Sequence, residues 1–265
     1  MKNLIFTIFI LSTSLSFAQK RYDYYNSDVK KSKGMIRVSK EGELLTGVVF
    51  GNFNNGKLEF EENYKDGLKN GFDRQWTKNG QLVYERSYIN GKRNGTYKDW
   101  DKKGQLRWEK EYENGLQNGI EKYWNKKGQL VWEDNYKNGK KDGLSKWYDK
   151  KGPLIWEDNY KNGKKDGLSK YYNENGKVEV EEFFHNGKKD GLSKWYDENG
   201  KVEREAFFQN GEKDGLSKWY DKKGQLIWEE NYKNGKKDGL SKYYNENGKL
   251  EFEEFFQNGK KVKRN

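Results

Sequence analysis

The chain has 265 residues, a formal net charge of +11, no cysteine and one histidine, His185. These counts exclude a disulfide framework and a cysteine-based zinc or nucleophile site, and they nearly exclude a Ser-His-Asp triad or a two-histidine metal site. Hydrophobic residues make up only 32%, against about 45–50% in ordinary globular domains, while aromatic residues reach 16%. Since disordered chains are poor in aromatic residues, this composition predicts a thin, exposed β structure.

Residues 1–18 have the pattern of a secretory signal peptide. A basic start at Lys2 precedes an apolar run that ends at Phe17. Small residues at the end of this run are typical of a signal-peptidase site and predict cleavage between Ala18 and Gln19. The apolar run is shorter than the roughly 20 residues that a membrane-spanning helix needs. The sequence therefore predicts a helical signal segment that is removed on export. The mature chain is expected to be secreted, periplasmic or held at the cell envelope, without a transmembrane segment.

The two ends of the mature chain depart from the regular pattern between them, as terminal repeats do. Residues 19–45 are expected to form an N-terminal cap, in which 35–38 (Met-Ile-Arg-Val) predicts a capping strand. Residues 262–265 form a basic tail, and lysine near an exposed edge discourages the end-to-end growth of a sheet. The segment between them, 46–261, is predicted to be a repeat array.

Glycines recur in this array at a constant spacing of 24 residues. Eight full units cover 70–261, and one degenerate unit precedes them at 46–69. Positions are counted here from the repeat glycine, so that Gly143 is position 0 and Tyr148 is position 5 of its unit. A fixed period of this length is typical of architectures in which each unit is stable only against its neighbours. The repeat glycines are Gly71, Gly95, Gly119, Gly143, Gly167, Gly191, Gly215 and Gly239.

Two turns divide each unit into a β-hairpin. The segment 149–152 (Asp-Lys-Lys-Gly) is typical of a three-residue loop with glycine in the left-handed region. The other turn, at Asn138-Gly139, permits a similar loop or a two-residue Asn-Gly turn. Side chains alternate between the faces of a sheet, and a two-residue turn at one end alone would exchange the faces in every unit. We therefore expect three-residue loops at both ends, with odd positions on one face and even positions on the other.

This register predicts an all-β fold, an elongated single-layer antiparallel meander of stacked β-hairpins. It places the basic residue of position 3 opposite position 13, so that Lys146 lies over the indole of Trp156, a contact worth about 0.5–1 kcal/mol when exposed. It also places the aromatic residues of position 4 in a row, facing away from the mainly apolar side. Such a row is typical of a binding surface, while cross-strand packing is the alternative explanation. The candidate binding row is Tyr123, Trp147, Tyr171, Trp195, Trp219 and Tyr243.

Neither of the features that could suggest catalysis predicts an enzyme. Position 14 is Glu in every unit, whereas glycoside hydrolysis needs one particular pair of carboxylates, so a structural role is expected for this column. His185 falls in a turn and is expected to be solvated. The glycine spacing follows the turns and does not match a phosphate-binding loop. No catalytic, cofactor-binding or metal-binding residue is predicted.

The repeat resembles a known family. The segment 136–143 (Tyr-Lys-Asn-Gly-Lys-Lys-Asp-Gly) is similar to the Asn-Gly-Lys…Gly core of MORN repeats, and its continuation through Trp147 to Tyr160 resembles the bacterial MORN-variant repeat. The resemblance covers 46–261 in register. It implies hairpin stacks that contact proteins or lipid surfaces, without catalytic residues or cofactors. Many bacterial relatives carry an antitoxin-component label.

Together these observations predict an exported, non-catalytic repeat scaffold for protein–protein or envelope-surface interaction. The alternatives are a carbohydrate- or cell-wall-binding repeat protein and an antitoxin-like inhibitor that binds a partner toxin. The positive charge is spread along the array, which favours a protein partner, an anionic envelope polymer or a lipid surface. Export argues against nucleic acid as the partner.

Overall fold

The computed structural model describes residues 19–25, 29–32, 36–38 and 42–263. Within these ranges the chain forms strands and tight turns, and none of it is long and apolar enough as a helix to cross a membrane. The predicted signal helix and Ala18 lie outside the described residues, while Gln19 is exposed at their beginning.

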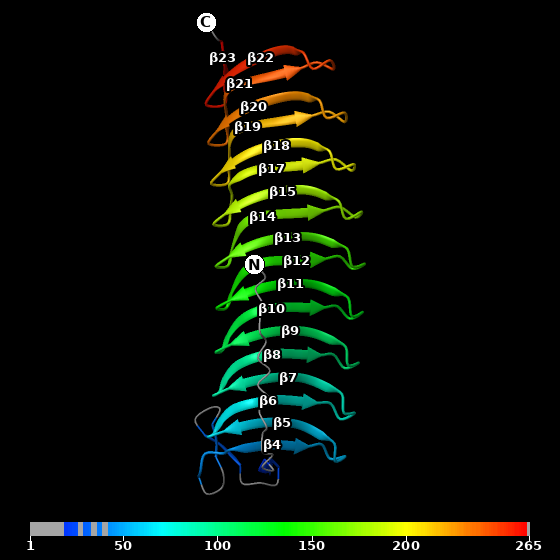
Figure 1. The fold of residues 1–265 in the computed structure, drawn as a ribbon, viewed down its shortest axis with the longest axis vertical. Helices are drawn as coiled ribbons and strands as arrows, with labels where there is room; N and C mark the ends of the chain where they lie inside the picture. Colours follow the sequence, from blue (N-terminus) through cyan, green and yellow to red (C-terminus); the bar gives the residue numbers. More distant parts are fainter. Residues whose placement is uncertain (1–18, 26–28, 33–35, 39–41, 264–265) are drawn as a thin grey trace, which may run out of the picture.

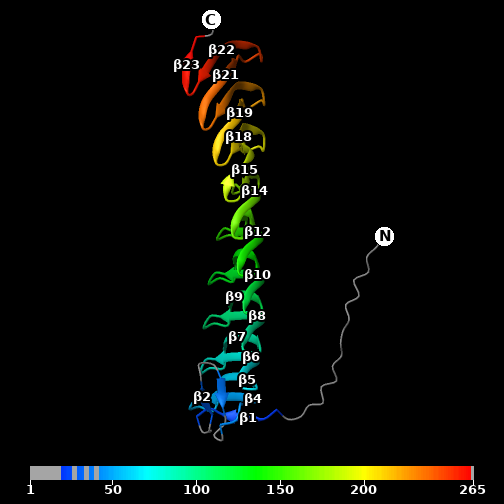
Figure 2. The ribbon, with the colours of Figure 1, turned by 90° about the vertical axis from the view of Figure 1, so that its left-hand side faces the viewer.

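One sheet of 21 strands forms the body of the molecule. Successive strands pair antiparallel in chain order, and they lie across the long axis of an extended stack (Figures 1 and 2). The prediction of an all-β meander of stacked hairpins is therefore confirmed. The strands of the array are β4 (Gly47–Asn52), β5 (Leu58–Lys65), β6 (Leu68–Trp76), β7 (Leu82–Ile89), β8 (Lys92–Trp100), β9 (Leu106–Glu113), β10 (Leu116–Trp124), β11 (Leu130–Lys137), β12 (Lys140–Tyr148), β13 (Leu154–Lys161), β14 (Lys164–Tyr172), β15 (Val178–His185), β16 (Lys188–Lys189), β17 (Gly191–Tyr196), β18 (Val202–Gln209), β19 (Glu212–Tyr220), β20 (Leu226–Lys233), β21 (Lys236–Tyr244), β22 (Leu250–Gln257) and β23 (Lys260–Val262).

A short strand closes the first edge of the array. β1 (Arg21–Asp23) pairs with β4 in parallel, whereas the other strand pairs of this described sheet are antiparallel. The predicted capping strand exists as β3 (Ile36–Val38), but it pairs with β2 (Lys30–Ser32) in a separate two-stranded sheet. The capping strand that hydrogen-bonds to the array is thus β1 rather than β3.

An apolar core exists only at this end of the described structure. Leu45, Val49 and Tyr64 are buried together, and Tyr22 and Phe60 pack against them. Along the rest of the array, the buried side chains are mostly polar or charged. They are Asp73, Glu121, Asp134, Ser145, Asp158, Ser169, Glu182, Ser193, Ser217, Glu230 and Ser241. The array therefore depends on its backbone ladder, its ion pairs and its stacked rings more than on an apolar interior.

The two turns of each unit differ, and our prediction for one of them is wrong. The loop after Asp149 has three residues, as predicted, because the Asp149 amide donates to the Pro153 carbonyl at 2.8 Å. The other turn has two residues, since Lys161 pairs with Lys164. Asn162 and Gly163 have φ values of 51° and 85°, as a type I′ turn requires.

A β-bulge explains why the argument from side-chain alternation failed. Trp147 pairs with Trp156, but the next residue, Tyr148, pairs with Leu154, so Ile155 is an extra residue on its strand. This one-residue bulge restores the alternation that loops of unequal length would break. Loop lengths alone therefore do not determine which face a side chain occupies, because a bulge adds one residue to one strand of the pair.

The observed register changes which residues face one another. Lys146 lies opposite Glu157 and not opposite Trp156. Ser145 and Trp147 lie opposite Asp158 and Trp156, respectively, so the odd-and-even division of the faces is also wrong. We call the surface that carries positions 2, 4, 13, 15, 17 and 22 the aromatic face. The surface that carries positions 3, 5 and 14 is the glutamate face.

Backbone and side-chain bonds attach each two-residue turn to the preceding hairpin. The Gly163 amide donates to the Lys141 carbonyl at 2.7 Å, and the Asn162 amide donates to Asp142 Oδ2 at 3.0 Å. The same pair of contacts recurs one unit later, from Gly187 and Asn186. The otherwise orphaned turn amides are thereby satisfied, and successive hairpins are held in one register.

Candidate binding face

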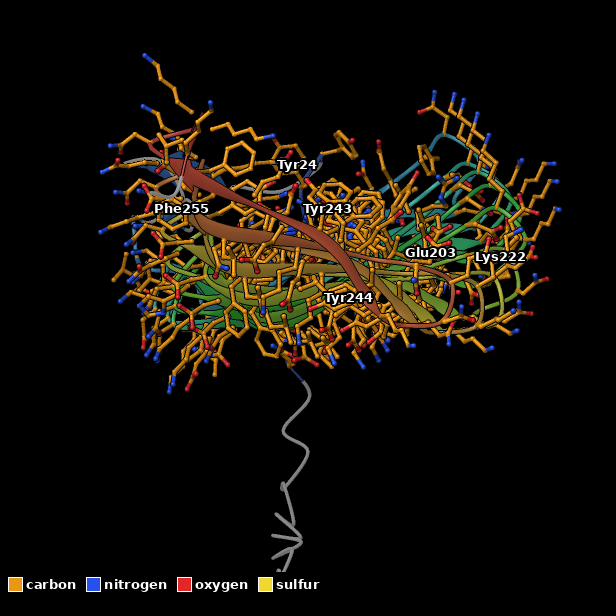
Figure 3. All side chains as sticks on the ribbon, turned by 90° about the horizontal axis from the view of Figure 1, so that it is seen from above. Tyr24, Glu203, Lys222, Tyr243, Tyr244 and Phe255 are labelled. Carbon is orange, nitrogen blue, oxygen red and sulfur yellow. The ribbon has the colours of Figure 1, made fainter. Side chains whose placement is uncertain are left out.

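The aromatic face carries a row of rings along the long axis of the molecule. All six residues of the predicted row lie on this face at position 4, and they are half-buried rather than fully exposed. Position 13 of the neighbouring strand supplies a second set of rings to the same row. Figure 3 shows the rings gathered in the middle of one face, with Tyr243 on that side and its neighbour Tyr244 on the other.

Cross-strand pairs of rings stack in this row. The ring centroids lie 5.0 Å apart in Trp147–Trp156, 4.7 Å apart in Trp219–Trp228 and 4.4 Å apart in Tyr243–Phe252. Such pairs contribute about 0.5–1.5 kcal/mol each beyond the area that they bury. Sequence reasoning missed position 13, because the incorrect register placed it on the other face. That the row binds a ligand stays a prediction.

Beside the rings, buried charges on the same face form ion pairs. Asp158 is only 3% exposed, and Lys165 Nζ lies 2.9 Å from each of its carboxylate oxygens. The same ammonium group lies 5.1 Å from the centre of the Phe184 ring. Burial opposes the charge of Lys165, but the hydrogen bond and the charge of Asp158 outweigh it and raise the pKa of the lysine. Lys165 at position 22 thus makes a cation–π contact, whereas Lys146 at position 3, for which a contact with Trp156 was predicted, pairs with Glu133.

The glutamate face holds a ladder of glutamate, lysine and tyrosine. The Tyr172 hydroxyl donates to Glu157 Oε1 at 2.8 Å, and Lys170 Nζ lies 3.4 Å from Glu181 Oε1. Burial, together with the hydrogen bond to Glu157, raises the pKa of Tyr172 to about 12. Tyr196 and Tyr220 repeat this arrangement, and their hydroxyl groups donate to Glu181 and Glu205, respectively. The glutamates are therefore engaged one by one along the array and form no single isolated pair.

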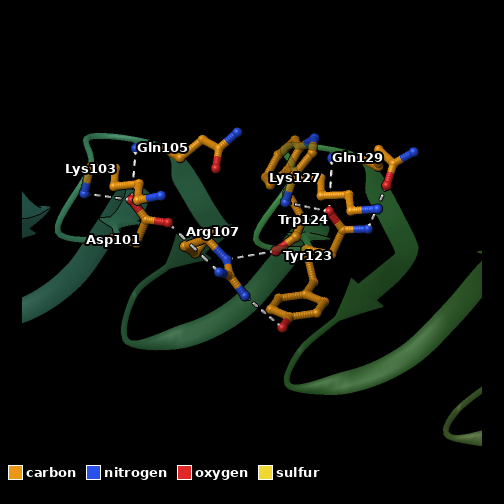
Figure 4. A network of polar contacts seen from close by, with 9 residues as sticks. Asp101, Lys103, Gln105, Arg107, Tyr123, Trp124, Lys127 and Gln129 are labelled. Carbon is orange, nitrogen blue, oxygen red and sulfur yellow. Dashed lines mark hydrogen bonds and ion pairs between the residues drawn. The ribbon is translucent and has the colours of Figure 1, made fainter. Parts of the chain in front are cut away.

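A polar network at the loop side fixes the start of the ring row (Figure 4). Arg107 donates from Nη2 to the Tyr123 hydroxyl at 2.8 Å and from Nε to the Trp124 carbonyl at 2.7 Å. Its Nη1 lies 3.8 Å from Asp101 Oδ2. The backbone amide of Gln105 is the main cause that holds the pKa of Asp101 below its usual range. The network thereby orients Tyr123 within the row.

The histidine is a solvated turn residue with one charged neighbour. The His185 side chain is 66% exposed, and its Nδ1 lies 3.2 Å from Asp166 Oδ2. Among the residues that the structure describes, no three His, Asp or Glu side chains come close enough together to hold a metal ion.

Comparison with known proteins identifies the repeat. The family described as MORN repeat variant matches residues 45–66, 165–186, 189–210, 213–234 and 237–258. The chain carries MORN-variant repeats. The match at 165–186 takes in nearly all of β14 and β15, so a MORN-variant unit is one hairpin closed by the three-residue loop. The resemblance predicted from 136–143 is thereby confirmed for the chain.

Similarity beyond the MORN-variant repeats is slight. No curated protein matches the chain. Among solved structures, the crystal structure of TcdB2-TccC3-Cdc42 is similar at 10% identity and a TM-score of 0.17, over 79% of this chain and 14% of that one. The crystal structure of TcdB2-TccC3-TEV is similar at 11% identity and a TM-score of 0.15, over 84% of this chain and 16% of that one. The chain thus spans a small fraction of the length of these structures.

Proposed function

We propose that this protein is an exported, non-catalytic scaffold that binds a protein partner or an anionic surface of the cell envelope through its aromatic face. The observation that carries the proposal is the row of half-buried rings of positions 4 and 13, which follows the long axis of the sheet. Rings of this kind, partly ordered by their neighbours, are the usual anchors of binding surfaces.

The contrast between the two faces supports the choice of the aromatic face. On the glutamate face, tyrosine hydroxyls and lysines already engage the carboxylates of each unit, as in Tyr196 with Glu181 at 2.8 Å. On the aromatic face, no further layer of the described structure covers the edges and outer surfaces of the rings. The lysines of position 22 border the rings, as Lys213 does at 4.6 Å from the Tyr232 ring centre. A ligand with apolar surface and negative charge is complementary to this face.

Export is the second part of the proposal. It rests on the signal-peptide pattern of residues 1–18 and on the cleavage point between Ala18 and Gln19. The excess of basic residues in the chain supports attraction to anionic envelope polymers or lipids. Fractionation of cells that produce the full chain tests this part, and recovery of an uncleaved chain in the cytoplasm would contradict it.

A carbohydrate-binding function is the second candidate. It is favoured by a shallow pocket in the ring row, lined by Trp195, Arg204, Trp219 and Trp228 among others. Aromatic walls with a few polar groups are the usual composition of small-ligand sites. Here the partner would be a glycan of the envelope rather than a protein.

Matched variants on the two faces test the proposed function. The first carries Trp147→Ala, Trp195→Ala and Trp219→Ala on the aromatic face. The control carries Tyr148→Ala, Tyr172→Ala and Tyr196→Ala, three residues of the glutamate face that do not line the pocket beside Trp219. The mature chain is crosslinked to envelope fractions, and thermal unfolding confirms that both variants are folded. We expect the first variant to lose its crosslinked partner and the second to keep it, and the reverse result would contradict the proposal.

A further inference from the structure

One unit of the array lacks the carboxylate that balances its lysine. In six other units, the lysine of position 22 forms an ion pair with an acidic residue of position 15. In the unit of Gly191, position 15 is Ala206, which is fully buried. Lys213, at position 22, therefore has no ion pair within the described ranges. The six pairs are Lys69–Glu62, Lys141–Asp134, Lys165–Asp158, Lys189–Glu182, Lys237–Glu230 and Lys261–Glu254.

The two remaining units have no lysine at position 22, where Arg93 and Gln117 stand instead. There, position 15 is basic, and each cation pairs with a carboxylate of the adjacent strand. Arg86 Nη2 lies 3.8 Å from Asp99 Oδ1, and Lys110 Nζ lies 2.8 Å from Glu121 Oε1. Arg93 also has no ion pair within the described ranges, but it donates a hydrogen bond to the Tyr112 hydroxyl at 3.2 Å. The unit of Gly191 differs in having an apolar residue, Ala206, at position 15 beside two cations that form no ion pair in the described structure.

The same unit adds a second cation where other units have a ring or a valine. Position 13 is Arg204, whose guanidinium carbon lies 3.7 Å from the centre of the Trp195 ring. Across the next strand pair, Arg204 lies opposite Trp219. Its Nε is buried and has no hydrogen-bond partner, and it forms no ion pair in the part of the chain that the structure describes. Arginine stays charged at every physiological pH, so the charge cannot be relieved by deprotonation.

Lys213 and Arg204 act on each other electrostatically. Lys213 Nζ lies 4.6 Å from the Tyr232 ring centre and 5.4 Å from the Trp219 ring centre. Burial lowers the pKa of Lys213, and the positive charge of Arg204 lowers it further. Glu230 opposes this shift, but its carboxylate is already engaged by Lys237 and by the Tyr232 hydroxyl. Two half-buried cations without a counter-charge of their own are unfavourable until an anion joins them.

A pocket lies beside Arg204, and Lys213, which does not line it, has its Nζ 5.4 Å from the ring centre of Trp219 in the pocket wall. Trp195, Arg204, Trp219 and Trp228 line it, Tyr220 and Ile227 complete the wall, and the exposed Glu203 lines it as well. The buried hydroxyl groups of Ser193 and Ser217 lie opposite Ala206 on the two adjoining strands, and neither has a hydrogen-bond partner. Ala206 is therefore buried between the two serines and does not line the pocket, and its effect is to remove a carboxylate from beside the two cations.

We infer that Arg204 and Lys213 bind the carboxylate of an acidic sugar, whose ring lies against the indoles of Trp219 and Trp228. The carboxylate supplies the charge that Ala206 leaves out, and arginine can bind it through two parallel hydrogen bonds. A sugar fits better than an acidic peptide, because the walls are flat and the ring row continues to Tyr243 and Phe252, as a linear polymer requires. This inference rests on the proposed function and names its partner as a uronate-bearing envelope glycan.

Calorimetric titration of the mature chain tests the ligand class. The probes are a trimer of galacturonic acid, the neutral trisaccharide maltotriose and a tri-glutamate peptide. We expect the galacturonate trimer to bind at one site, with an affinity that falls as salt is added. Maltotriose lacks the carboxylate and should bind at least about tenfold more weakly, because it cannot form the hydrogen bonds between a carboxylate and the charged Arg204. Preference for the peptide over the acidic sugar would overturn the assignment.

Substitutions at one position test the site itself. Ala206→Glu restores the carboxylate found in the neighbouring units, and it should weaken binding about tenfold while the fold is kept. Ala206→Ser keeps the site open and should bind as the natural chain does. The double variant Val180→Arg with Glu182→Ala recreates the arrangement one unit earlier and should add a second binding site. Unchanged affinity in Ala206→Glu would overturn the inference.

The outcomes separate this inference from the proposed function. If the tryptophan variants lose their envelope partner while Ala206→Glu binds the galacturonate trimer normally, the scaffold function stands and the uronate site fails. If Ala206→Glu loses the trimer while crosslinking does not depend on the aromatic face, the site stands and the scaffold function fails.

Discussion

Replacement of Gly167 by alanine should destabilise the array much more than replacement of Gly176 in the same unit. Gly167 has a φ of 109°, and a Cβ there would lie 3.2 Å from the Cβ of Asn159. Gly176 has a φ of 74°, and no atom lies within 4 Å of its added Cβ. Both substitutions strain the backbone, but only the first also meets a neighbour.

The magnitudes follow from these two environments. Alanine in the left-handed region costs about 1–2 kcal/mol, which is the whole effect expected for Gly176→Ala. For Gly167→Ala, displacement of Asn159 also weakens the bond that its Nδ2 donates to the Leu168 carbonyl at 2.7 Å. A lost hydrogen bond adds about 1 kcal/mol, so we expect about 3 kcal/mol in total.

Urea unfolding of the mature chain, followed by circular dichroism, measures the difference. The slope of the transition must be compared between variants, because repeat arrays can lose their single transition when one unit is weakened. Equal destabilisation by the two substitutions would refute the role given to the Asn159 contact. A stabilised Gly167→Ala variant would refute the observed register at that strand.

Three further outcomes follow from the charged and polar contacts. Lys165→Met should lower the free energy of unfolding in urea by about 3 kcal/mol, because it leaves the buried Asp158 carboxylate unpaired. Lys213→Met should lower it little, and equal losses in the two variants would contradict this. The pKa of Tyr172, Tyr196 and Tyr220 is raised from 10.0 to about 12 in the folded chain, so the stability they contribute is present below pH 10 and is lost as pH rises towards 12. The urea midpoint of unfolding, measured between pH 10 and pH 12, should fall less steeply in the triple Tyr→Phe variant than in the natural chain. An identical fall in both would show that these tyrosines do not contribute to the pH dependence. Glu157→Gln should cost at most about 1 kcal/mol and leave envelope crosslinking unchanged, and a complete loss of crosslinking would show that this column is functional.

The hairpin architecture could be predicted from the sequence, because Gly at fixed spacing and Asp or Asn before it specify turns locally. The register could not. It depends on Ile155, an extra residue whose side chain gives no sign of a bulge, and on a two-residue turn at Asn162-Gly163. Loop chemistry is local, but pairing is a property of two strands together. One bulge was enough to move Trp156 to the other face and to separate Lys146 from it.

The candidate row at position 4 could be predicted, since its aromatic residues recur in every later unit. The partners of that row at position 13 followed only from the pairing. The signal for the uronate site was present in the repeat itself, because Arg204 and Ala206 depart from their columns. Its meaning required the structure, which brings both columns and Lys213 onto one face.

The orientation of the strands determines how the molecule responds to tension. The strands lie across the long axis, and the array ends at opposite poles (Figure 1). A force applied to the two termini therefore acts along the hydrogen bonds between neighbouring strands and breaks them one pair after another. We expect a compliant tether that lengthens in even increments of 24 residues under single-molecule stretching. One abrupt rupture of the whole array would contradict this, whereas opening in increments lets the molecule lengthen without losing all of its strand pairing at once.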